Sequence, residues 1–282
     1  DTHWFRPDFD LHLIEEAQRL SVEYFDRTDL TEIHESADEI RLCGLRGGEV
    51  IEFRVGFVVD ATGPRGCLFR LLGLAKRKLP LMPSTCGLFA HFRNVGTWPS
   101  AAGAPYPVED AAVHHVFDGG WVWVLKFNNG ITSAGVAANK TRSESLRLYE
   151  GRVGWDRLLD QLPSLAKQFS GSKSVNDFVF ARPLSYSTGD VVGRRWALLP
   201  SAAGFVDPLL STGFPLMLLG VQRLAKLLGD WPSETELSAY RYETLAELDQ
   251  VSRLVGALYA SMDDFELFTA LTQLYFAAVS FS

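Results

Sequence analysis

Cysteine is scarce in this sequence, and its placement excludes several kinds of site. The chain has three cysteines, Cys43, Cys67 and Cys86, an odd number at spacings that no common metal site uses. They predict reduced thiols in a cytoplasmic protein rather than a disulfide framework or a metal centre. A basic stretch followed by an apolar one is missing from residues 1–10, so a signal peptide is not expected there.

Excess basic charge and long apolar runs are absent as well. Lys and Arg number 27 against 34 Asp and Glu, which gives a net charge of −7 and argues against a nucleic-acid partner. No apolar run reaches the roughly 18 residues that a membrane-spanning helix needs, so no transmembrane segment is expected. Hydrophobic residues still make up 47% of the 282, enough to offset chain entropy in one large domain or two ordinary ones.

The first third of the chain predicts a mixture of helix and short strands. Apolar residues recur at helical spacing over 9–20, which predicts a helix. Four strands are predicted next, the last two joined as a hairpin by Arg46-Gly47-Gly48, at 22–25, 30–33, 39–45 and 50–55. An almost wholly apolar strand at 56–60 is typical of a buried position, and it is followed by a turn-rich loop at 61–66 and a short helix at 67–72.

From about Pro80 the pattern changes to that of an antiparallel sheet. Alternating or aromatic-rich runs separated by turns predict four strands, at 86–92, 111–117, 121–127 and 131–137. An amphipathic helix is predicted over 144–161, and a further strand with a connection within 175–187.

The last third returns to a strand, a loop and then helices. A buried strand at 196–199 runs into a loop of small residues at 200–213, and the apolar segment 214–228 predicts a buried helix. Two more helices are predicted, over 234–258 and 264–281. The order is α/β, a β insertion, α/β again and then helices, which predicts a mixed α/β protein.

The most informative segment is Pro200-Ser-Ala-Ala-Gly-Phe-Val-Asp-Pro-Leu-Leu-Ser-Thr-Gly-Phe214. It joins a buried strand to a helix, and its small residues let a ligand approach the backbone. The helix begins near Thr212-Gly213, where unpaired N–H groups and a partial positive charge favour an anion or a developing negative charge. The plainer alternative is a capped helix, with Ser211 or Thr212 as the N-cap and Gly213 present for close packing.

A second loop, Ala61-Thr-Gly-Pro64, follows the strand Phe57-Val-Val-Asp60. Its small residues permit close approach to a phosphate or a ribose, as in turns beside a nucleotide. Taken alone, the same residues also fit an ordinary strand-to-helix turn.

Together and in this order, the two loops resemble those of the FAD-dependent monooxygenase and flavin-dependent halogenase superfamily. Members carry a Val-Val-Asp-Ala-Thr-Gly turn beside the FAD, here at 58–63, and a Gly-Asp-Ala-Ala-Gly-Phe-x-Asp-Pro-x-x-Ser-Thr-Gly segment, here at 200–213. Arg6-Pro-Asp-Phe-Asp10 is similar to the family's Arg-x-x-Phe-Asp segment. Gly119-Gly-Trp-Val-Trp123 resembles the Trp-x-Trp strand of the halogenase branch, so the resemblance extends over most of residues 1–228.

The resemblance implies the FAD-binding fold of the glutathione-reductase-like, hydroxylase type, present as a fragment. It implies an FAD-binding part at 1–79 and 191–230, an inserted antiparallel β-sheet substrate domain at 80–190, and a helical C-terminal region at 231–282. No Gly-x-Gly-x-x-Gly follows a strand in this sequence, so the N-terminal portion that holds the pyrophosphate is expected to be missing. This chain alone is therefore expected to bind FAD weakly or not at all.

The same resemblance implies FAD as the cofactor and assigns residues to it. Arg6 would approach the pyrophosphate, although an ordinary surface arginine fits the sequence nearly as well. Asp60, Thr62 and Gly63 would lie beside the adenosine half. The residues implied along the ribityl chain and the flavin ring come from the later loop: Ser201, Ala202, Asp207, Pro208, Ser211, Thr212, Gly213 and Phe214. No catalytic residue and no metal ligand is identified.

Aromatic and imidazole side chains lie on the predicted sheet. Trp121 and Trp123, two apart on one strand, face the same side and either wall a substrate pocket or form a core pair. His114 and His115 face opposite sides, so only one of them can face a pocket, and both also fit ordinary polar sheet positions.

Three departures from the family pattern bear on the cofactor and the substrate. Pro200-Ser201 stands where the family has Gly-Asp. Ser201 can therefore offer the ribityl hydroxyls a hydrogen bond from its neutral hydroxyl, but no charged carboxylate. Tryptophan halogenases have Glu immediately before Ser-Thr-Gly, and Leu210 at this position argues against tryptophan as the substrate. The Trp-x-Trp-x-Ile-Pro motif of the halogenase branch ends here as Leu125-Lys126, so only its first part is present. Lys126 is not the family's halogenating lysine.

The resemblance implies an FAD-dependent oxidoreductase that uses oxygen as a monooxygenase or halogenase. It would act on an aromatic or other electron-rich small molecule through a flavin hydroperoxide, with halide in the halogenase case and a separate flavin reductase or NAD(P)H as electron source. Two alternatives stay open: a flavoprotein like geranylgeranyl reductase or lycopene cyclase, and a degenerate, non-catalytic flavin-fold protein. The missing fingerprint and Pro200-Ser201 favour the last of these.

Overall fold

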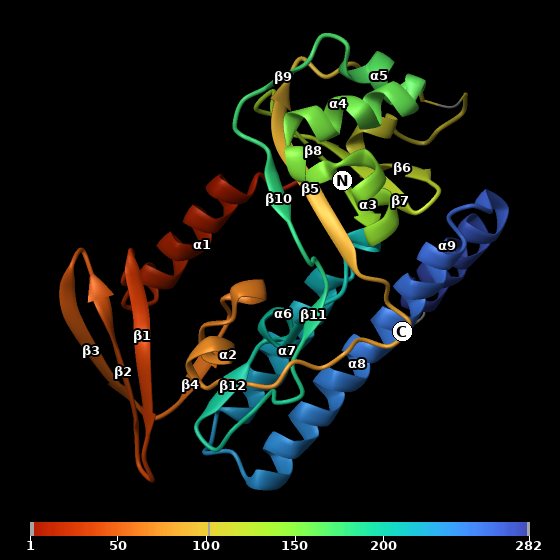
Figure 1. Cartoon of the computed structure of the whole chain (residues 1–282). Helices are drawn as coiled ribbons and strands as arrows, with labels where there is room; N and C mark the ends of the chain where they lie inside the picture. Colours follow the sequence, from red (N-terminus) through yellow and green to blue (C-terminus); the bar gives the residue numbers. More distant parts are fainter. Residues whose placement is uncertain (1–2, 101, 281–282) are drawn as a thin grey trace. The chain divides into compact units, whose positions relative to one another are not determined.

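The computed structural model describes residues 3–100 and 102–280 of the 282 (Figure 1). The chain divides into two compact units, each built from segments that are far apart in the sequence. Unit 1 contains the described residues up to Val22, the segment Pro83–Leu184 and the described residues from Ala257 onward. Unit 2 contains Glu23–Met82 and Ser185–Gly256.

A six-stranded antiparallel sheet forms the centre of unit 1. Five strands follow the order β10-β5-β8-β7-β6, and β9 pairs with β5. The strands are β5 (Thr85–Arg93), β6 (Val113–Phe117), β7 (Gly120–Lys126), β8 (Thr132–Asn139), β9 (Lys173–Ser174) and β10 (Val179–Ala181). The four strands predicted from the alternating runs are confirmed, with ends shifted by one or two residues.

Alternation along these strands decides which face of the sheet holds the core. Leu88, Phe92 and Val122 point to one face and pack with three helices. These helices are α3 (Lys140–Leu146), α4 (Arg152–Gln161) and α5 (Pro163–Phe169). Trp155 of α4 lies in this core, with its ring centroid 5.5 Å from that of Phe92 and 5.3 Å from that of Phe169.

The single helix predicted over 144–161 is wrong. The chain instead makes α3, a 3-10 turn at Leu148–Glu150 and then α4. Arg147 has φ 52° and Gly151 has φ 62°, and a residue in the left-handed region interrupts a right-handed helix.

Two further helices belong to unit 1, α1 (Arg6–Arg19) and α9 (Phe265–Ser280). The helix predicted over 9–20 is confirmed, and it begins earlier because Pro7 suits the first helical turn. The last predicted helix is confirmed as α9, while its predicted end at Phe281 lies outside the described residues.

Unit 2 contains a three-stranded antiparallel sheet in the order β1-β2-β3. Its strands are β1 (Thr28–Glu35), β2 (Ile40–Arg46) and β3 (Glu49–Val55). Gly47 and Gly48 join β2 to β3 with φ of 61° and 92°, which glycine adopts without steric cost, and the predicted hairpin is confirmed. The strand predicted over 22–25 is wrong, because no described strand pairs with these residues.

Two short strand pairs complete unit 2. β4 (Val58–Asp60) runs parallel to β12 (Trp196–Leu198), and β11 (Tyr186–Ser187) runs antiparallel to β13 (Gly204–Phe205). The helices are α2 (Cys67–Leu71), α6 (Pro200–Ala203), α7 (Gly213–Leu227) and α8 (Glu234–Ala260), whose last turn belongs to unit 1. The buried strand predicted at 196–199 is confirmed in shorter form as β12. A strand is confirmed within 56–60 as β4, but its predicted burial is wrong, because Val59 is 40% exposed and only Asp60 is buried.

Two predictions for the later loop are corrected. Residues 200–203 form the helical turn α6 rather than loop, with Pro200 at the first helical position, where its missing N–H is not needed. Helix α7 is not buried as predicted: Gly220 and Leu224 are its buried residues, whereas Leu218 and Val221 are exposed. Unit 2 therefore covers one narrow stripe of α7.

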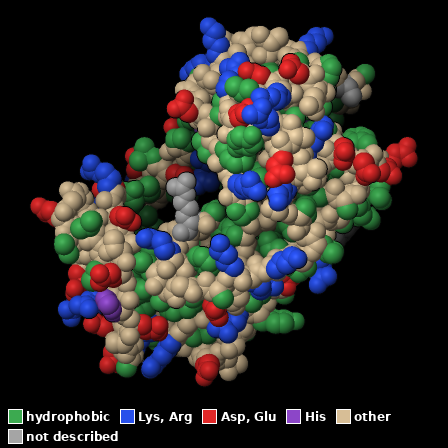
Figure 2. Space-filling model, in the orientation of Figure 1, with side chains coloured by type: hydrophobic (Ala, Val, Ile, Leu, Met, Phe, Trp, Pro, Cys, Tyr) green, Lys and Arg blue, Asp and Glu red, His purple; other side chains and the backbone are tan. Residues whose placement is uncertain are grey.

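Charged side chains of both signs are interspersed over the face that Figure 2 draws, with apolar side chains between them. None of the described helices is both long and apolar enough to cross a membrane. Within residues 3–100 and 102–280, no group of three or more His, Cys, Asp or Glu side chains is placed to hold a metal ion.

Candidate functional site

The two loops singled out in the sequence follow the carboxyl ends of two paired strands. β4 and β12 run parallel, with Val58 opposite Trp196 and Asp60 opposite Leu198. One residue further, the Leu199 N–H donates to the Asp60 carbonyl at 2.9 Å. The two loops therefore begin side by side at the carboxyl ends of parallel strands, which is where open α/β sheets bind their ligands.

Asp60 shapes the first loop from within. It is buried, and one carboxylate oxygen accepts hydrogen bonds from the Thr62 N–H at 2.8 Å and the Thr62 hydroxyl at 2.6 Å. The other oxygen accepts from the Leu68 N–H at 2.7 Å, and the Cys67 N–H donates to Thr62 Oγ1 at 2.7 Å. These bonds hold the turn and the start of α2, and the expected contact of Asp60 and Thr62 with a cofactor stays a prediction.

Gly63 begins a 3-10 turn, η1 (Gly63–Arg65). Its φ is 70°, and a side chain added there would meet no described atom within 4 Å. Both α6 and β13 lie against η1. Gly63 itself is buried, but the described residues leave space for an added side chain there, beside the segment that begins the second loop.

The second loop turns back through α6 and β13, and its side chains are engaged within the protein. The Ser201 hydroxyl donates to Met217 Sδ of α7 at 3.3 Å, and Ala202 is buried. Asp207 is buried too, and its carboxylate accepts from the Leu209 N–H at 3.1 Å. These contacts fix the course of the loop between β12 and α7.

Two residues of this loop hold left-handed backbone conformations although neither is glycine. Leu210 has φ 62° and Ser211 has φ 53°, in the short turn η4 (Leu209–Ser211) that follows Pro208. Such a conformation costs an L-residue about 1–2 kcal/mol, and strain of this kind gathers at functional sites. Leu and Ser do not favour the left-handed region, so no sequence signal announces this strain.

Ser211→Gly should stabilise the protein by about 1 kcal/mol, because glycine adopts this φ without the steric cost that serine bears. Ser238→Gly is the matched control, since it makes the same change on the exposed surface of α8. The control should destabilise by about 0.5 kcal/mol through helix propensity. Urea unfolding measures both variants, and effects of the same sign would contradict the strain at Ser211.

Helix α7 begins at the end of the loop, directly after Thr212. Thr212 is the N-cap residue and is buried, yet its side chain makes no capping hydrogen bond to the described backbone, which does not support the capped-helix alternative. A side chain added at Gly213 would find no atom of the described chain within 4 Å, and Phe214 is 50% exposed. The start of this 15-residue helix is suited to an anion or to the anionic edge of a ring.

Part of the second loop lines a narrow hollow between α6, α7 and α8. Among the expected cofactor residues, its lining includes Ser201, Asp207, Thr212 and Gly213. The strand pair places Asp60, Thr62 and Gly63 at the start of the neighbouring loop. The structure therefore brings together the expected residues of unit 2, although they come from opposite halves of the chain.

The remaining expected cofactor residue is Arg6. It belongs to unit 1 and begins α1, where its guanidinium donates to both carboxylate oxygens of Asp10 at 2.7 and 2.9 Å. The Arg6 side chain is 75% exposed, as in an ordinary ion pair one turn apart on a helix surface. The expected approach of Arg6 to a pyrophosphate stays a prediction.

Trp121 and Trp123 lie on one face of the unit 1 sheet, as predicted, and this face is opposite the helical core. Their ring centroids are 5.6 Å apart, and the Phe89 ring is 6.2 Å from Trp123. Trp123 covers Gly135, where any side chain would collide with the indole, and its Nε1 donates to Ser133 Oγ at 3.4 Å. Trp121 is 1% exposed and Trp123 is half-buried, and their role towards a substrate stays a prediction.

Comparison with known proteins decides the family. Residues 6–268 match the family model described as tryptophan halogenase. The chain belongs to the tryptophan halogenase family.

Two curated relatives agree with this family membership. The monodechloroaminopyrrolnitrin halogenase PrnC of Pseudomonas fluorescens is 26% identical, over 98% of this chain and 50% of its own length. The tetracycline 7-halogenase of Kitasatospora aureofaciens is 28% identical, over 98% of this chain and 52% of its own length. The chain thus spans about half the length of the curated relatives it matches.

Solved structures show the fold of this halogenase-family chain. Halogenase PltM in complex with phloroglucinol and FAD matches with a TM-score of 0.86 at 24% identity, over 97% of this chain and 57% of that one. The flavin-dependent brominase Bmp2 matches with a TM-score of 0.75 at 20% identity, over 92% of this chain and 64% of that one. The predicted mixed α/β fold is therefore confirmed over most of the chain.

The sheet face that carries Trp121 and Trp123, called here the tryptophan face, also carries a half-buried imidazole, that of His114. The His114 ring centroid lies 4.7 Å from that of Trp121, whereas the His115 ring packs 4.7 Å from Trp98. The two histidines therefore face opposite sides of the sheet, as predicted. Burial, with His115 close by, lowers the pKa of His114 to about 4. His114 is thus a neutral hydrogen-bonding group at neutral pH.

This shift predicts a loss of stability on the acid side. The folded-state pKa of His114 lies below its ordinary value of 6.5, so the unfolded chain takes up the proton first as the pH falls. The stability contributed by neutral His114 is complete above about pH 6.5 and is lost as the pH falls towards 4. When the pH falls from 7 to 4.5, the free energy of unfolding of His114→Phe, measured with urea, should decrease by about 2 kcal/mol less than that of wild type. Equal losses in the two proteins would contradict the assigned shift.

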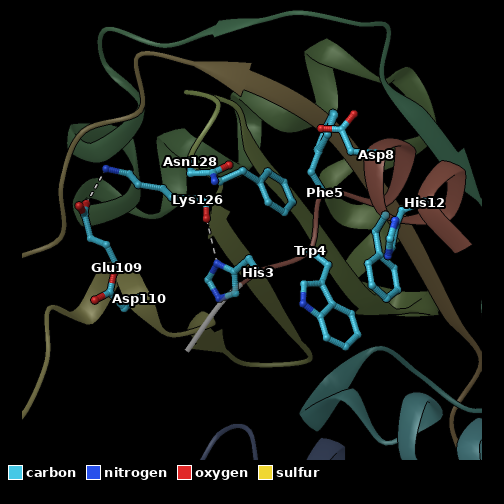
Figure 3. Close-up of a pocket in the computed structure, with 11 residues that line it drawn as sticks. His3, Trp4, Phe5, Asp8, His12, Glu109, Asp110, Lys126 and Asn128 are labelled. Atoms are coloured by element: carbon cyan, nitrogen blue, oxygen red, sulfur yellow. Dashed lines mark hydrogen bonds and ion pairs between the residues drawn. The ribbon is translucent and has the colours of Figure 1, made fainter.

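A cavity of about 690 Å³ opens in unit 1 between the segment before α1, the 3-10 turn Val108–Asp110 and the end of β7 (Figure 3). Lys126 Nζ lies 2.5 Å from a Glu109 carboxylate oxygen, and His3 Nδ1 lies 2.9 Å from the Lys126 carbonyl oxygen. The Phe5 and Phe127 rings form part of its wall, 5.2 Å apart. Rings beside an ion pair suit an aromatic molecule with a polar substituent. The cavity was not predicted from the sequence.

Proposed function

We propose that this chain supplies the flavin-binding and substrate-binding sides of an FAD-dependent halogenase that acts on an aromatic small molecule. The observation that carries the proposal is the meeting of the two family loops at the carboxyl ends of β4 and β12, where no described atom lies within 4 Å of a side chain added at Gly63 or Gly213. Family membership supports it, because the relatives above are named as halogenases of monodechloroaminopyrrolnitrin and of tetracycline.

The residues of the two loops fit FAD. No described atom would meet a side chain added at Gly63 or Gly213, which leaves room there for a flat ligand. The start of α7 suits the anionic edge of a reduced flavin. Asp60 and Asp207 hold the two loops in shape through hydrogen bonds to backbone N–H groups. Bound FAD would supply the activation of oxygen, while the protein binds, orients and excludes water.

For the substrate, we propose the tryptophan face of the unit 1 sheet. Half-buried Trp123 and Phe89 present aromatic rings over buried Trp121, and neutral His114 offers a hydrogen bond without charge. Leu210 gives the second loop no carboxylate to hold an amino group. These features favour an uncharged aromatic substrate over free tryptophan.

We propose the same functional parts of the chain that the sequence predicts. The segments 1–79 and 191–230 belong to the FAD-binding part, 80–190 to the substrate part and 231–282 to a helical region. The enzyme would work in the cytoplasm with oxygen and halide, and with a separate flavin reductase or NAD(P)H as its electron source.

Product analysis with and without halide tests the proposal. The protein is mixed with FAD, NADH, a flavin reductase, oxygen and phloroglucinol as the probe aromatic, in chloride, bromide or halide-free buffer. Mass spectrometry should detect a chlorinated or brominated product that depends on the halide. A hydroxylated product in halide-free buffer would assign the chain to the monooxygenases instead, and the absence of any product would contradict catalysis by this chain.

A further inference from the structure

Two tyrosine hydroxyls hold the backbone where the second loop leaves β12. The hydroxyl of Tyr240, a buried residue, donates to the Leu198 carbonyl at 2.8 Å. The Tyr186 hydroxyl donates to the Ser201 carbonyl. These two carbonyls flank the Leu199-Pro200 step at which the strand turns into α6, so the two hydrogen bonds fix the direction of α6.

Tyr186 holds α6 at both ends. Its main chain pairs with Phe205, just after α6, while its phenol reaches Ser201 within α6. Burial, together with the negative charge of Asp60, raises the pKa of Tyr186 above its ordinary range. The phenol therefore keeps its proton throughout the physiological pH range and remains a hydrogen-bond donor.

Helix α6 lies between the two loops of the proposed flavin site. It packs against η1, which begins at Gly63, and against α7, which begins at Gly213. On the α7 side, Pro200 lies so close to Gly220 that any side chain at Gly220 would collide with the proline ring. Because close-packed elements transmit displacement, a change in the direction of α6 shifts Gly63 relative to Gly213.

We propose that Tyr186 is a positioning residue for the flavin, because its hydrogen bond to Ser201 fixes α6 and thereby the spacing of the two loops. The inference rests on the proposed function, since it requires both loops to contact FAD. It is separate from packing, because removal of the hydroxyl alone leaves the aromatic ring of Tyr186 in place.

Tyr186→Phe in the full chain tests this role through two measurements. The first is the dissociation constant for FAD, from flavin fluorescence titrated to millimolar concentration. It should rise about five- to tenfold, the equivalent of one hydrogen bond. The second is amide hydrogen exchange over residues 201–205 without FAD, which should accelerate by about the same factor.

Ser252→Ala is the matched control, since it removes another hydroxyl-to-carbonyl hydrogen bond in unit 2, to Pro80. It should lower the thermal midpoint about as much as Tyr186→Phe does and leave FAD affinity unchanged. Wild type and Tyr186→Phe binding FAD equally would overturn the inference and leave the proposed function intact. Unchanged exchange over residues 201–205 would overturn it too. A wild type that fails to bind millimolar FAD would overturn the proposed function, and the inference with it.

Discussion

Gly213→Val should weaken FAD binding at least a hundredfold and leave the folded protein intact. Gly213 begins α7, and a side chain added there would meet no atom of the described residues within 4 Å. The valine therefore strains the fold little, but it occupies the space proposed for the flavin at the start of the helix. A hundredfold loss corresponds to about 2.8 kcal/mol, and flavin fluorescence during titration to millimolar FAD measures it.

Gly189→Val is the matched control for this substitution. Gly189 also belongs to unit 2, and a side chain added there likewise has no described neighbour within 4 Å, but it lies outside both loops. FAD affinity should stay unchanged in this variant. If Gly213→Val bound FAD as tightly as wild type, the flavin would not lie at the start of α7.

Asp60→Ala should lower the free energy of unfolding by about 3 to 5 kcal/mol. The substitution removes the acceptor for the Thr62 N–H, the Thr62 hydroxyl and the Leu68 N–H in a turn whose centre is buried. Donors that lose a charged, buried acceptor cost more than an exposed hydrogen bond does. Asp60→Asn should cost about half as much, because the amide keeps one carbonyl oxygen as an acceptor. Urea unfolding measures both variants.

Asp230→Ala provides the comparison for Asp60→Ala, since Asp230 is an exposed aspartate in the same unit. Its replacement should change the unfolding free energy by less than about 0.5 kcal/mol. If Asp60→Ala were as stable as this control, the hydrogen bonds of Asp60 would not hold the first loop.

The antiparallel sheet of unit 1 is predictable because its information is local. Alternation at Leu88, Ala90 and Phe92 marks a half-buried strand without knowledge of its partner, and these residues do point into the core. The hairpin at Gly47-Gly48 is local too, because two glycines permit the positive φ that a tight turn needs.

The centre of the candidate site cannot be predicted from local sequence, because it depends on contacts between segments that are far apart in the chain. β4 and β12 have three residues each and lie far apart in the sequence, and a short apolar run does not specify its partner. The bonding of Asp60 to Thr62 and Leu68 depends on the folded turn. A family resemblance could place these residues near a cofactor, but it could not show that the Asp60 carboxylate is already engaged.

The wrong predictions have the same physical origin. Arg147 ends α3 in a left-handed conformation, and neither its residue type nor the apolar spacing around it signals this. Helix α7 was expected to be buried because it is apolar, yet composition does not determine which face a neighbouring element covers. The turn α6 depends on packing against α7, which a loop-like composition conceals.

Hydrogen exchange in the presence of FAD locates the ligand most directly. Amides of residues 61–66 and 204–214 are followed in the full chain with FAD raised to millimolar concentration. We predict that exchange slows in both segments together, because the two loops leave neighbouring strands and would share one flavin. Bound FAD that leaves exchange in both segments unchanged, while slowing it elsewhere, would contradict a flavin site at the ends of β4 and β12.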